Sequence, residues 1–471
     1  IDTQIKQTHV AFAGKILQYN TTPGQDFHGT LVAGAAVGDA GAADDLRGVA
    51  YDSQLVYNFL PGGSSPPGAA EEADLLARFD LHHSQGARVH TNSWGDDGDT
   101  SYNGFARAVD EFTWANEDDV VVFAITNQLT LRTPENAKNA LAVGASFDTP
   151  NQNAIGSGGH GPTSDNRRKP ELFTPGISIR GPGILNDTAV TSGSGTSFAA
   201  PAAAGAALLA RQYFTDGFYP TGAATPADSF VPSGALLRAT LLNAASNMTA
   251  VPSTSNDTWP NNNEGFGLLK LDDALFFTGD SRTLRVFDIR HADPQALTTG
   301  AQWSTQLRVL DAAEPLRATL VWTDPPATLG AAVATVNNLD LEAVSPSGVV
   351  YKGNVFDPAA RTSVPGGAFD DRNTVEQIHL PSPETGDWTF RVSAASVNVG
   401  PQGFAVVVSG AVGDVPPCPA DIDGDGAVGP GDLFLLLGSW GSGPGPADVD
   451  QSGSVGPGDL FMLLGSWGGC P

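Results

Sequence analysis

The serine at position 197 stands where a turn of small residues meets a long apolar run. The stretch Gly193–Ala210 reads GSGTSFAAPAAAGAALLA. Serine is a common helix N-cap, because its oxygen accepts a hydrogen bond from an otherwise unbonded backbone N–H. A helix start also favours developing negative charge, which suits a nucleophile. The segment alone therefore leaves two compatible interpretations of Ser197, a cap and a nucleophile.

Three other residues could supply what a nucleophilic serine requires. His28 opens the helical stretch FHGTLVAGAAVGD and is a candidate base for the hydroxyl proton of Ser197. Asp2, in IDTQIKQTHVAF, can orient the imidazole and stabilise its cation. Asn127 ends the apolar segment VVVFAITN and can donate, with the Ser197 backbone N–H, to a developing oxyanion. Each residue alone has a commonplace alternative, as a cap, a turn residue or a loop amide, but together they predict acyl transfer.

Strands and helices alternate along the part of the chain that must position these residues. Short apolar segments predict strands at residues 54–60, 88–92, 119–125 and 140–145. Helical stretches lie between them, including residues 70–85 and 104–116. This alternation predicts an α/β domain over residues 1–277, with a parallel sheet covered by helices on both faces. Sites in such sheets form beyond the carboxyl ends of the strands.

The pattern changes after residue 277 to short alternating strands separated by Pro, Gly and Asn. These strands, at residues 318–322, 339–343, 388–392 and 404–408, predict a β-sandwich or jelly-roll domain over 281–412. A proline-rich linker follows at 413–420. Residues 421–471 contain a tandem repeat, DIDGDGAVGPGDLFLLLGSWG from Asp421 and DVDQSGSVGPGDLFMLLGSWG from Asp448.

The separated motifs resemble those of the subtilases, the subtilisin-like serine proteases. SGTSFAAP is similar to the serine motif of that family, HGTLVAG to its histidine motif and DTQIKQTHVAF to its aspartate motif. The resemblance implies a catalytic triad of Asp2, His28 and Ser197, with Asn127 in the oxyanion hole. It implies a serine endopeptidase that cleaves proteins or peptides through an acyl-enzyme intermediate. LVWTDPPA, NNLDLEAVSPSG and DDRNTVE resemble the C-terminal jelly roll of one bacterial subtilase branch.

The resemblance also implies that an extended substrate binds as an added strand between two cleft segments. The residues expected to bind it are Ser93, Trp94 and Gly95 on one side and Ala124, Ile125 and Thr126 on the other. Trp94 has an alternative as an ordinary core residue. No clear acidic cluster demands a basic side chain in the substrate. We therefore expect a medium-sized apolar side chain before the scissile bond.

Several departures from the family pattern lie near the expected site. Gln4, Phe27, Thr126 and Leu129 stand where the family has glycine. Glycine permits positive φ and close backbone approach, so these residues are expected to strain the backbone or crowd the cleft. We also expect the domain to be N-terminally truncated, without the strand residues that would precede Asp2. The alternative function is therefore a catalytically impaired pseudo-protease that serves as a surface-attached binding or scaffold protein.

The terminal repeat resembles the paired EF-hand-type loops of dockerin modules. Its oxygen-bearing side chains have the spacing that Ca²⁺ ligands show in such loops. The first loop offers Asp421, Asp423, Asp425 and Asp432, and the second offers Asp448, Asp450, Ser452 and Asp459. We expect a small α-helical module that binds Ca²⁺. It would dock on a cohesin-like or cell-surface partner, or alternatively act as a stabilising cap or retention tag.

Cysteine content and charge indicate where the protein works. The only two cysteines, Cys418 and Cys470, bracket the terminal repeat. They predict one disulfide formed in an oxidising compartment. The chain of 471 residues carries a formal net charge of −27, which argues against nucleic acid as a partner. No apolar run is long enough to span a membrane, and we expect a secreted or cell-surface protein whose export signal lies outside this sequence.

Overall fold

The computed structural model describes residues 1–41, 46–60, 69–248, 259–415, 418–443, 445–450 and 452–470. The chain divides into two compact units. One comprises Ile1–Thr305 and Val309–Val412, and the other Gln306–Arg308 and Gly413–Pro471. Among the described residues, no helix combines the length and the apolar composition that crossing a membrane requires.

A five-stranded sheet forms the centre of the first unit. Its strands are β3 (Val89–Asn92), β4 (Val120–Ala124), β5 (Leu141–Ser146), β6 (Ile155–Ser157) and β7 (Leu172–Pro175). β3, β4 and β5 are neighbours in that order and run parallel, and β7 also pairs parallel with β5, whereas β6 pairs antiparallel with it. Every residue of β4 and β5 is buried, as expected for parallel strands covered on both faces.

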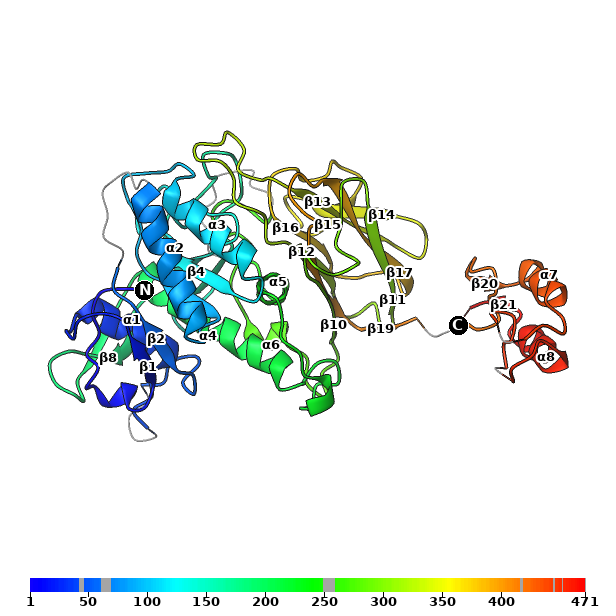
Figure 1. Cartoon of the computed structure of the whole chain (residues 1–471), viewed down its shortest axis with the longest axis horizontal. Coiled ribbons are helices and arrows are strands. Elements are labelled where there is room, and N and C mark those ends of the chain that lie inside the picture. Colours follow the sequence, from blue (N-terminus) through cyan, green and yellow to red (C-terminus); the bar gives the residue numbers. More distant parts are fainter. Residues whose placement is uncertain are drawn as a thin grey trace. The chain divides into compact units, whose positions relative to one another are not determined.

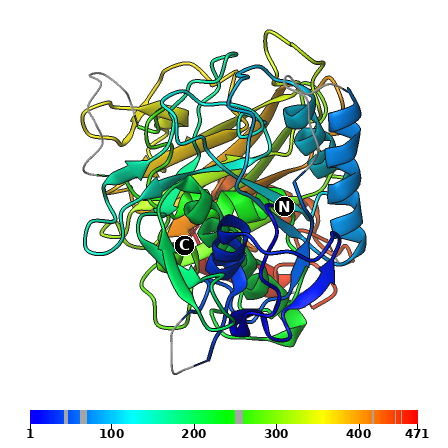
Figure 2. The ribbon, with the colours of Figure 1, turned by 90° about the vertical axis from the view of Figure 1, so that its left-hand side faces the viewer.

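Helices cover both faces of this sheet because β4 alternates its side chains between them. Val120, Val122 and Ala124 pack in one core with α4 (Thr196–Thr215) and α5 (Gly234–Asn243). Val121 and Phe123 pack in another with α2 (Ala69–Ser84) and α3 (Gly104–Ala115). α2 and α3 lie side by side in both views of the ribbon (Figures 1 and 2). The predicted α/β fold is therefore confirmed.

Smaller elements complete this half of the unit. They are η1 (Val10–Phe12), α1 (Phe27–Val37), η2 (Pro226–Asp228), α6 (Leu271–Ala274), the parallel pair β1 (Ile16–Tyr19) and β2 (Leu55–Tyr57), and the antiparallel pair β8 (Ile179–Pro182) and β9 (Val190–Gly193).

Antiparallel sheets follow, as the alternating pattern after residue 277 predicts. One sheet has the order β10-β18-β12-β16, and the other runs β15-β14-β13-β17-β11. Their strands are β10 (Thr283–Ile289), β11 (Gln302–Val309), β12 (Leu316–Val321), β13 (Asn338–Val344), β14 (Val350–Phe356), β15 (Ser363–Pro365), β16 (Val375–Leu380), β17 (Gly386–Ser396) and β18 (Phe404–Gly410), and β19 (Val412–Asp414) follows them.

The α/β half and the antiparallel half share one hydrophobic core. α5 places Leu236 and Leu241 in the same cluster as Val321 and Val407 of the antiparallel strands. The expected boundary near residue 280 therefore lies inside a single compact unit.

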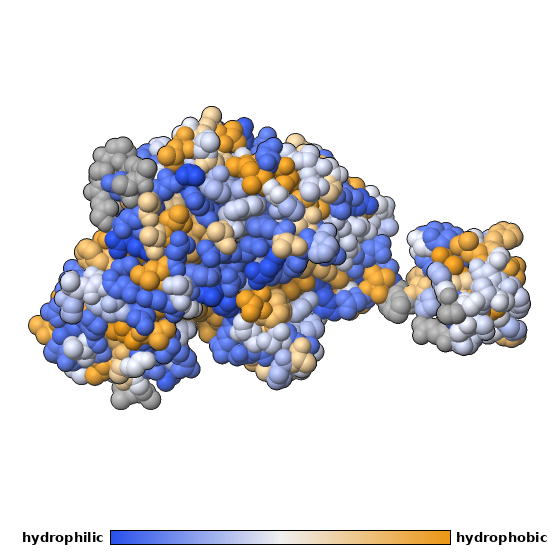
Figure 3. Space-filling view, in the orientation of Figure 1, coloured by the Kyte–Doolittle hydropathy of each residue, from blue (hydrophilic) through white to orange (hydrophobic). Residues whose placement is uncertain are grey.

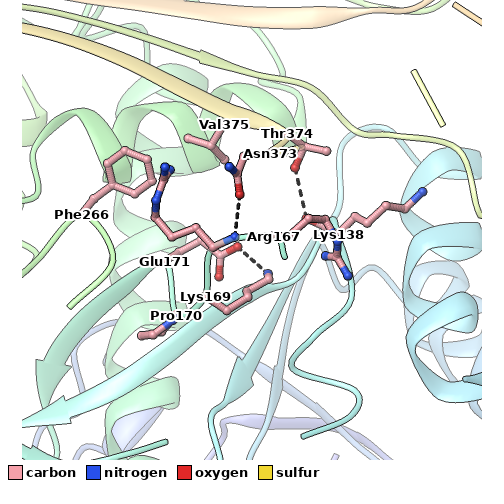
Figure 4. A pocket seen from close by; sticks show the side chains of 10 residues that line it. Lys138, Arg167, Lys169, Pro170, Glu171, Phe266, Asn373, Thr374 and Val375 are labelled. Atoms are coloured by element: carbon pink, nitrogen blue, oxygen red, sulfur yellow. Dashed lines mark hydrogen bonds and ion pairs between the residues drawn. The ribbon is translucent and has the colours of Figure 1, made fainter. Parts of the chain in front are cut away.

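Buried polar contacts reinforce this junction. Lys138 Nζ lies 2.6 Å from Asp324 Oδ2, and both side chains are fully buried. The Thr374 hydroxyl donates to the Lys138 carbonyl at 3.3 Å, and Arg168 N donates to Asn373 Oδ1 at 2.6 Å. Figure 4 shows Lys138 from the α/β half close to Asn373 and Thr374 from the antiparallel half. Chain segments 186 to 236 residues apart are thus tied together by buried and half-buried polar groups.

The second unit is small and built around two short helices. It contains β20 (Ala427–Val428), α7 (Pro430–Gly438), α8 (Pro457–Gly465) and β21 (Gly468–Gly469). Leu436 and Leu463, at equivalent positions of α7 and α8, are fully buried in its core. A disulfide joins Cys418 to Cys470.

Candidate active site

Asp2 and His28 form a close pair. Nδ1 of His28 lies 2.6 Å from Oδ1 of Asp2, whose side chain is 3 % exposed. The Asp2 backbone is held beside the segment after β2: its N–H donates to Asn58 O at 3.3 Å, and its carbonyl accepts from Leu60 N at 3.1 Å. Thr3 N donates to the same Oδ1 at 2.7 Å. The carboxylate thus has a fixed orientation and accepts from the imidazole at one oxygen.

The start of α1 positions His28. Asp26 is the N-cap of this helix, and its side chain accepts from His28 N at 2.8 Å. The side chain of His28 is 32 % exposed. Burial disfavours its cation, but the hydrogen bond and charge of Asp2 and the charge of Asp26 together outweigh burial, so the pKa of His28 is raised. Among the described residues Nε2 of His28 has no hydrogen-bond partner, which leaves it available as a base.

Ser197 is the second residue of α4, and Gly195 occupies the N-cap position. The cap interpretation of Ser197 is therefore wrong, because the helix begins before it. The next residue, Phe198, packs on the imidazole of His28 with ring centroids 5.7 Å apart. Ser197 itself makes no hydrogen bond to His28 in the described structure. Such bonds are often long without substrate and tighten when it binds.

Asn127 is oriented by the first turn of α4. Its Oδ1 accepts from Thr196 N at 3.1 Å and from the Ser157 hydroxyl at 2.7 Å. A backbone N–H can only donate, so the atom facing Thr196 N must be the oxygen. The close approach needs Gly195, which has φ +145° and where a Cβ would lie 3.2 Å from Asn127 Oδ1. Nδ2 of Asn127 has no partner among the described residues and remains free to donate.

A cavity of about 250 Å³ lies next to Asn127 and Ser197. It is lined by all six residues predicted to bind substrate, Ser93, Trp94, Gly95, Ala124, Ile125 and Thr126, together with Asn127 and Ser197. The Ser93 hydroxyl donates to the Ser197 carbonyl at 2.8 Å, which ties the end of β3 to α4. The ring of Trp94 also packs edge-on against Phe105 and Phe123. Trp94 therefore both lines the cavity and belongs to the core.

The expectation that the replaced glycines strain the backbone is wrong. Among the described non-glycine residues, positive φ occurs only at four positions elsewhere in the chain. Gln4 donates to the Thr22 carbonyl at 3.3 Å, and Leu129 and Phe27 are 80 % and 40 % exposed. Of the four replacements, only Thr126 lines the cavity.

Two acidic residues of the cavity wall, Asp97 and Glu135, were missed by the sequence analysis. Glu135 is 1 % exposed, and burial raises its pKa to about 7, although backbone N–H groups oppose the shift and Asp97 adds to it. The available signal was a lone carboxylate in the segment between β4 and β5, six residues before β5 begins. The path of that segment brings Glu135 to the same cavity as Ser93 and Asn127, which the spacing in the sequence does not reveal.

Carboxylates also gather in the second unit. Oxygens of Asp421, Asp423 and Asp425 lie within 4.8 Å of one another, and so do those of Asp448, Asp450 and Asp459. Asp432 is not in the first group, and its two oxygens accept from the backbone N–H groups of Ile422, Asp423 and Gly429. In the second loop the Ser452 hydroxyl donates to the Ser454 carbonyl at 3.2 Å, and the expected contribution of Ser452 to a Ca²⁺ site remains a prediction.

The acidic loops have features that a cation would satisfy. Oδ1 of Asp448 is buried and has no hydrogen-bond partner. In the first loop, slight burial and then the charges of Asp425, Asp432 and Asp421 raise the pKa of Asp423. Oxygen ligands of this kind suit Ca²⁺. The residues present therefore fit such an ion.

Comparisons with known proteins identify the family of the first part of the chain. The model of the subtilase family, Peptidase_S8, matches residues 1–267. The chain is 26 % identical over 510 residues to the serine protease/ABC transporter B family protein tagA of Dictyostelium discoideum, an alignment that covers 84 % of this chain and 28 % of tagA. For tagB of the same organism the identity is 26 % over 560 residues, covering 89 % of this chain and 29 % of tagB. The chain thus spans less than a third of the length of these relatives.

Solved structures show a more distant similarity. The prenylagaramide maturation protease PagA is 21 % identical, with a TM-score of 0.45, and the match covers 58 % of this chain and 90 % of PagA. The S41 psychrophilic protease is 21 % identical, with a TM-score of 0.43, and the match covers 57 % of this chain and 89 % of that one. The subtilase family model matches more than half of the length of this chain, so the chain belongs to the subtilase family of serine proteases.

Proposed function

We propose that the protein is an endopeptidase that uses Ser197 as nucleophile, His28 as general base and Asp2 as the residue that orients the base. The observation that carries this proposal is the 2.6 Å contact between Asp2 and His28, beside the helix start that bears Ser197. The contact fixes the proton on Nδ1, so the lone pair of Nε2 is available to a hydroxyl.

Each residue contributes one step of acyl transfer. His28 takes the hydroxyl proton of Ser197 as the Ser197 oxygen attacks the peptide carbonyl carbon, and His28 later gives that proton to the leaving amine. Asp2 stabilises the imidazolium that forms in between. The oxyanion accepts hydrogen bonds from Nδ2 of Asn127 and from the Ser197 N–H, which has no intrahelical acceptor in the first turn of α4. In the second half of the reaction His28 takes a proton from the water molecule that attacks the acyl-enzyme, and it returns that proton to the Ser197 oxygen as the acyl bond breaks.

A fluorophosphonate probe tests this assignment, because it labels only an activated serine. We expect Ser197→Ala to abolish labelling and His28→Ala to reduce it about 100-fold or more. Ser192→Ala, which removes an exposed hydroxyl of the nearby strand β9, is the matched control and should label normally. Labelling that survives Ser197→Ala would refute the assignment. A folded protein that takes up no probe would instead support the pseudo-protease alternative.

We further propose that the second unit is a dockerin-like module that binds Ca²⁺. Asp421, Asp423 and Asp425 would hold one ion, and Asp448, Asp450 and Asp459 would hold another. Bound Ca²⁺ would neutralise carboxylates that otherwise repel each other, and so stabilise the loops between the helices. The disulfide in the same unit supports a secreted or cell-surface location.

An exposed apolar surface on this unit supports an attachment function. The two repeats present the same kinds of side chain at equivalent positions, and Figure 3 shows apolar residues gathered on the unit. Phe434 and Phe461 are 74 % and 75 % exposed, and Trp440 and Trp467 are 46 % and 48 % exposed. Contiguous exposed apolar groups mark interaction sites in soluble proteins. We propose a cohesin-like or cell-surface partner for this surface.

A further inference from the structure

The cavity beside Ser197 has carboxylates where an apolar pocket was expected. We propose that it selects a lysine or arginine side chain at the substrate residue before the scissile bond, with Glu135 as the main determinant and Asp97 as a second one. This inference rests on the proposed peptidase function and specifies its substrate class.

Glu135 lines the cavity and is held there through one of its two carboxylate oxygens. Its Oε1 accepts from Thr126 N at 3.1 Å and from Arg132 N at 2.8 Å. Its Oε2 has no hydrogen-bond partner among the described residues. That oxygen lies next to Gly95, since a Cβ built on Gly95 would be 3.3 Å from it. Because Gly95, Thr126 and Glu135 all line the cavity, a side chain that enters the cavity can reach Oε2.

Asp97 brings a second negative charge to the same cavity. Its Oδ1 accepts from the Thr126 hydroxyl at 2.9 Å, so Thr126 connects to both carboxylates, one through its side chain and one through its backbone. Asp97 is exposed, whereas Glu135 is buried. The two acids therefore line the cavity at different depths.

No cation of the described chain neutralises this pair. Neither Asp97 nor Glu135 forms an ion pair with a described residue, and the neighbouring Arg132 donates instead to Gln128 Oε1 at 3.4 Å. A buried carboxylate without a countercharge is unfavourable, which is why burial raises the pKa of Glu135. An ammonium or guanidinium group in the cavity would supply that charge and a donor for Oε2. An apolar side chain would leave both carboxylates unpaired.

Matched peptide substrates test the inference. Four fluorogenic peptides would differ only at the residue before the scissile bond, with Lys, Arg, Leu or norleucine, which has an unbranched apolar chain and no charge. We expect kcat/KM for Lys and Arg to exceed that for norleucine by about 100-fold or more in the full-length chain. Glu135→Gln keeps the Oε1 acceptor for the two backbone N–H groups, so it should fold, and it should lower this ratio at least about tenfold. Asp97→Asn should lower it less.

Asp148→Asn is the matched control, because it removes one exposed negative charge outside the cavity. It should leave the ratio unchanged. Equal cleavage of the Lys and norleucine peptides by the unmodified protein would overturn the inference, as would a Glu135→Gln variant with an unaltered ratio. In both cases probe labelling of Ser197 would persist, so the proposed peptidase function would stand. Loss of both labelling and cleavage would overturn the two proposals together.

Discussion

Replacing Asp2 by asparagine removes a negative charge from the site while keeping the shape of the side chain. His28 Nδ1 and Thr3 N both contact Oδ1 of Asp2, at 2.6 and 2.7 Å, whereas Oδ2 is buried without a partner. An asparagine can keep its carbonyl oxygen at the position of Oδ1, because Thr3 N requires an acceptor there. Its NH₂ group then takes the place of Oδ2. The orientation and tautomer of His28 are preserved, and the substitution tests the charge alone.

The size of the effect follows from the imidazolium that forms during catalysis. Two opposite charges about 4 Å apart attract by about 4 kcal/mol at an effective dielectric constant of 20. At 1.36 kcal/mol for each factor of ten, this corresponds to about 10³ in rate. Because His28 is 32 % exposed, solvent screening reduces the effect, and we expect kcat/KM for Asp2→Asn to fall by about 10²–10³.

The same substitution should move the pH dependence in a defined direction. Burial lowers the pKa of His28, whereas the hydrogen bond and charge of Asp2, together with the charge of Asp26, raise it by more than that. Without the charge of Asp2 the pKa falls, so His28 becomes a free base at lower pH and the acid limb of the kcat/KM profile shifts to lower pH. Peptide hydrolysis measured across the acidic and neutral range checks both effects. A limb displaced to higher pH, or an undiminished plateau, would refute the assignment of Asp2.

Two further predictions concern stability. Lys138→Met should lower the free energy of unfolding by about 3–5 kcal/mol, since Asp324 then remains buried without its cationic partner. The double variant Lys138→Met/Asp324→Asn should restore part of this loss, because it also removes the buried negative charge. Chemical denaturation measures both variants, and a double variant less stable than the single one would contradict the argument. Removal of Ca²⁺ by a chelator should lower the melting temperature of the second unit in calorimetry, and Asp423→Asn should weaken the response to added Ca²⁺. Identical traces with and without chelator would exclude structural Ca²⁺ there.

The local parts of the fold could be predicted from the sequence, because they depend on neighbouring residues. The uninterrupted apolar run of β4 indicates a strand buried on both faces, and its two cores have that arrangement. The spacing of Asp2, His28 and Ser197 does not determine a distance, so these residues could be identified only as parts of recognisable motifs. The shared core around α5 could not be predicted, since it joins residues that are far apart in the chain and whose apolar pattern suits two separate domains equally well.

Thr126 shows why departures from a family pattern need the structure for their interpretation. In the sequence, a branched residue in place of glycine suggests a crowded cleft and favours the pseudo-protease alternative. In the structure, its hydroxyl donates to Asp97 and its N–H donates to Glu135, and its backbone does not have positive φ. A glycine there would lack the hydroxyl that holds Asp97 at the cavity. A substitution that suggests a lost activity in the sequence is therefore one of the residues that line the acidic cavity next to Ser197, which is the arrangement that the proposed selectivity for Lys or Arg requires.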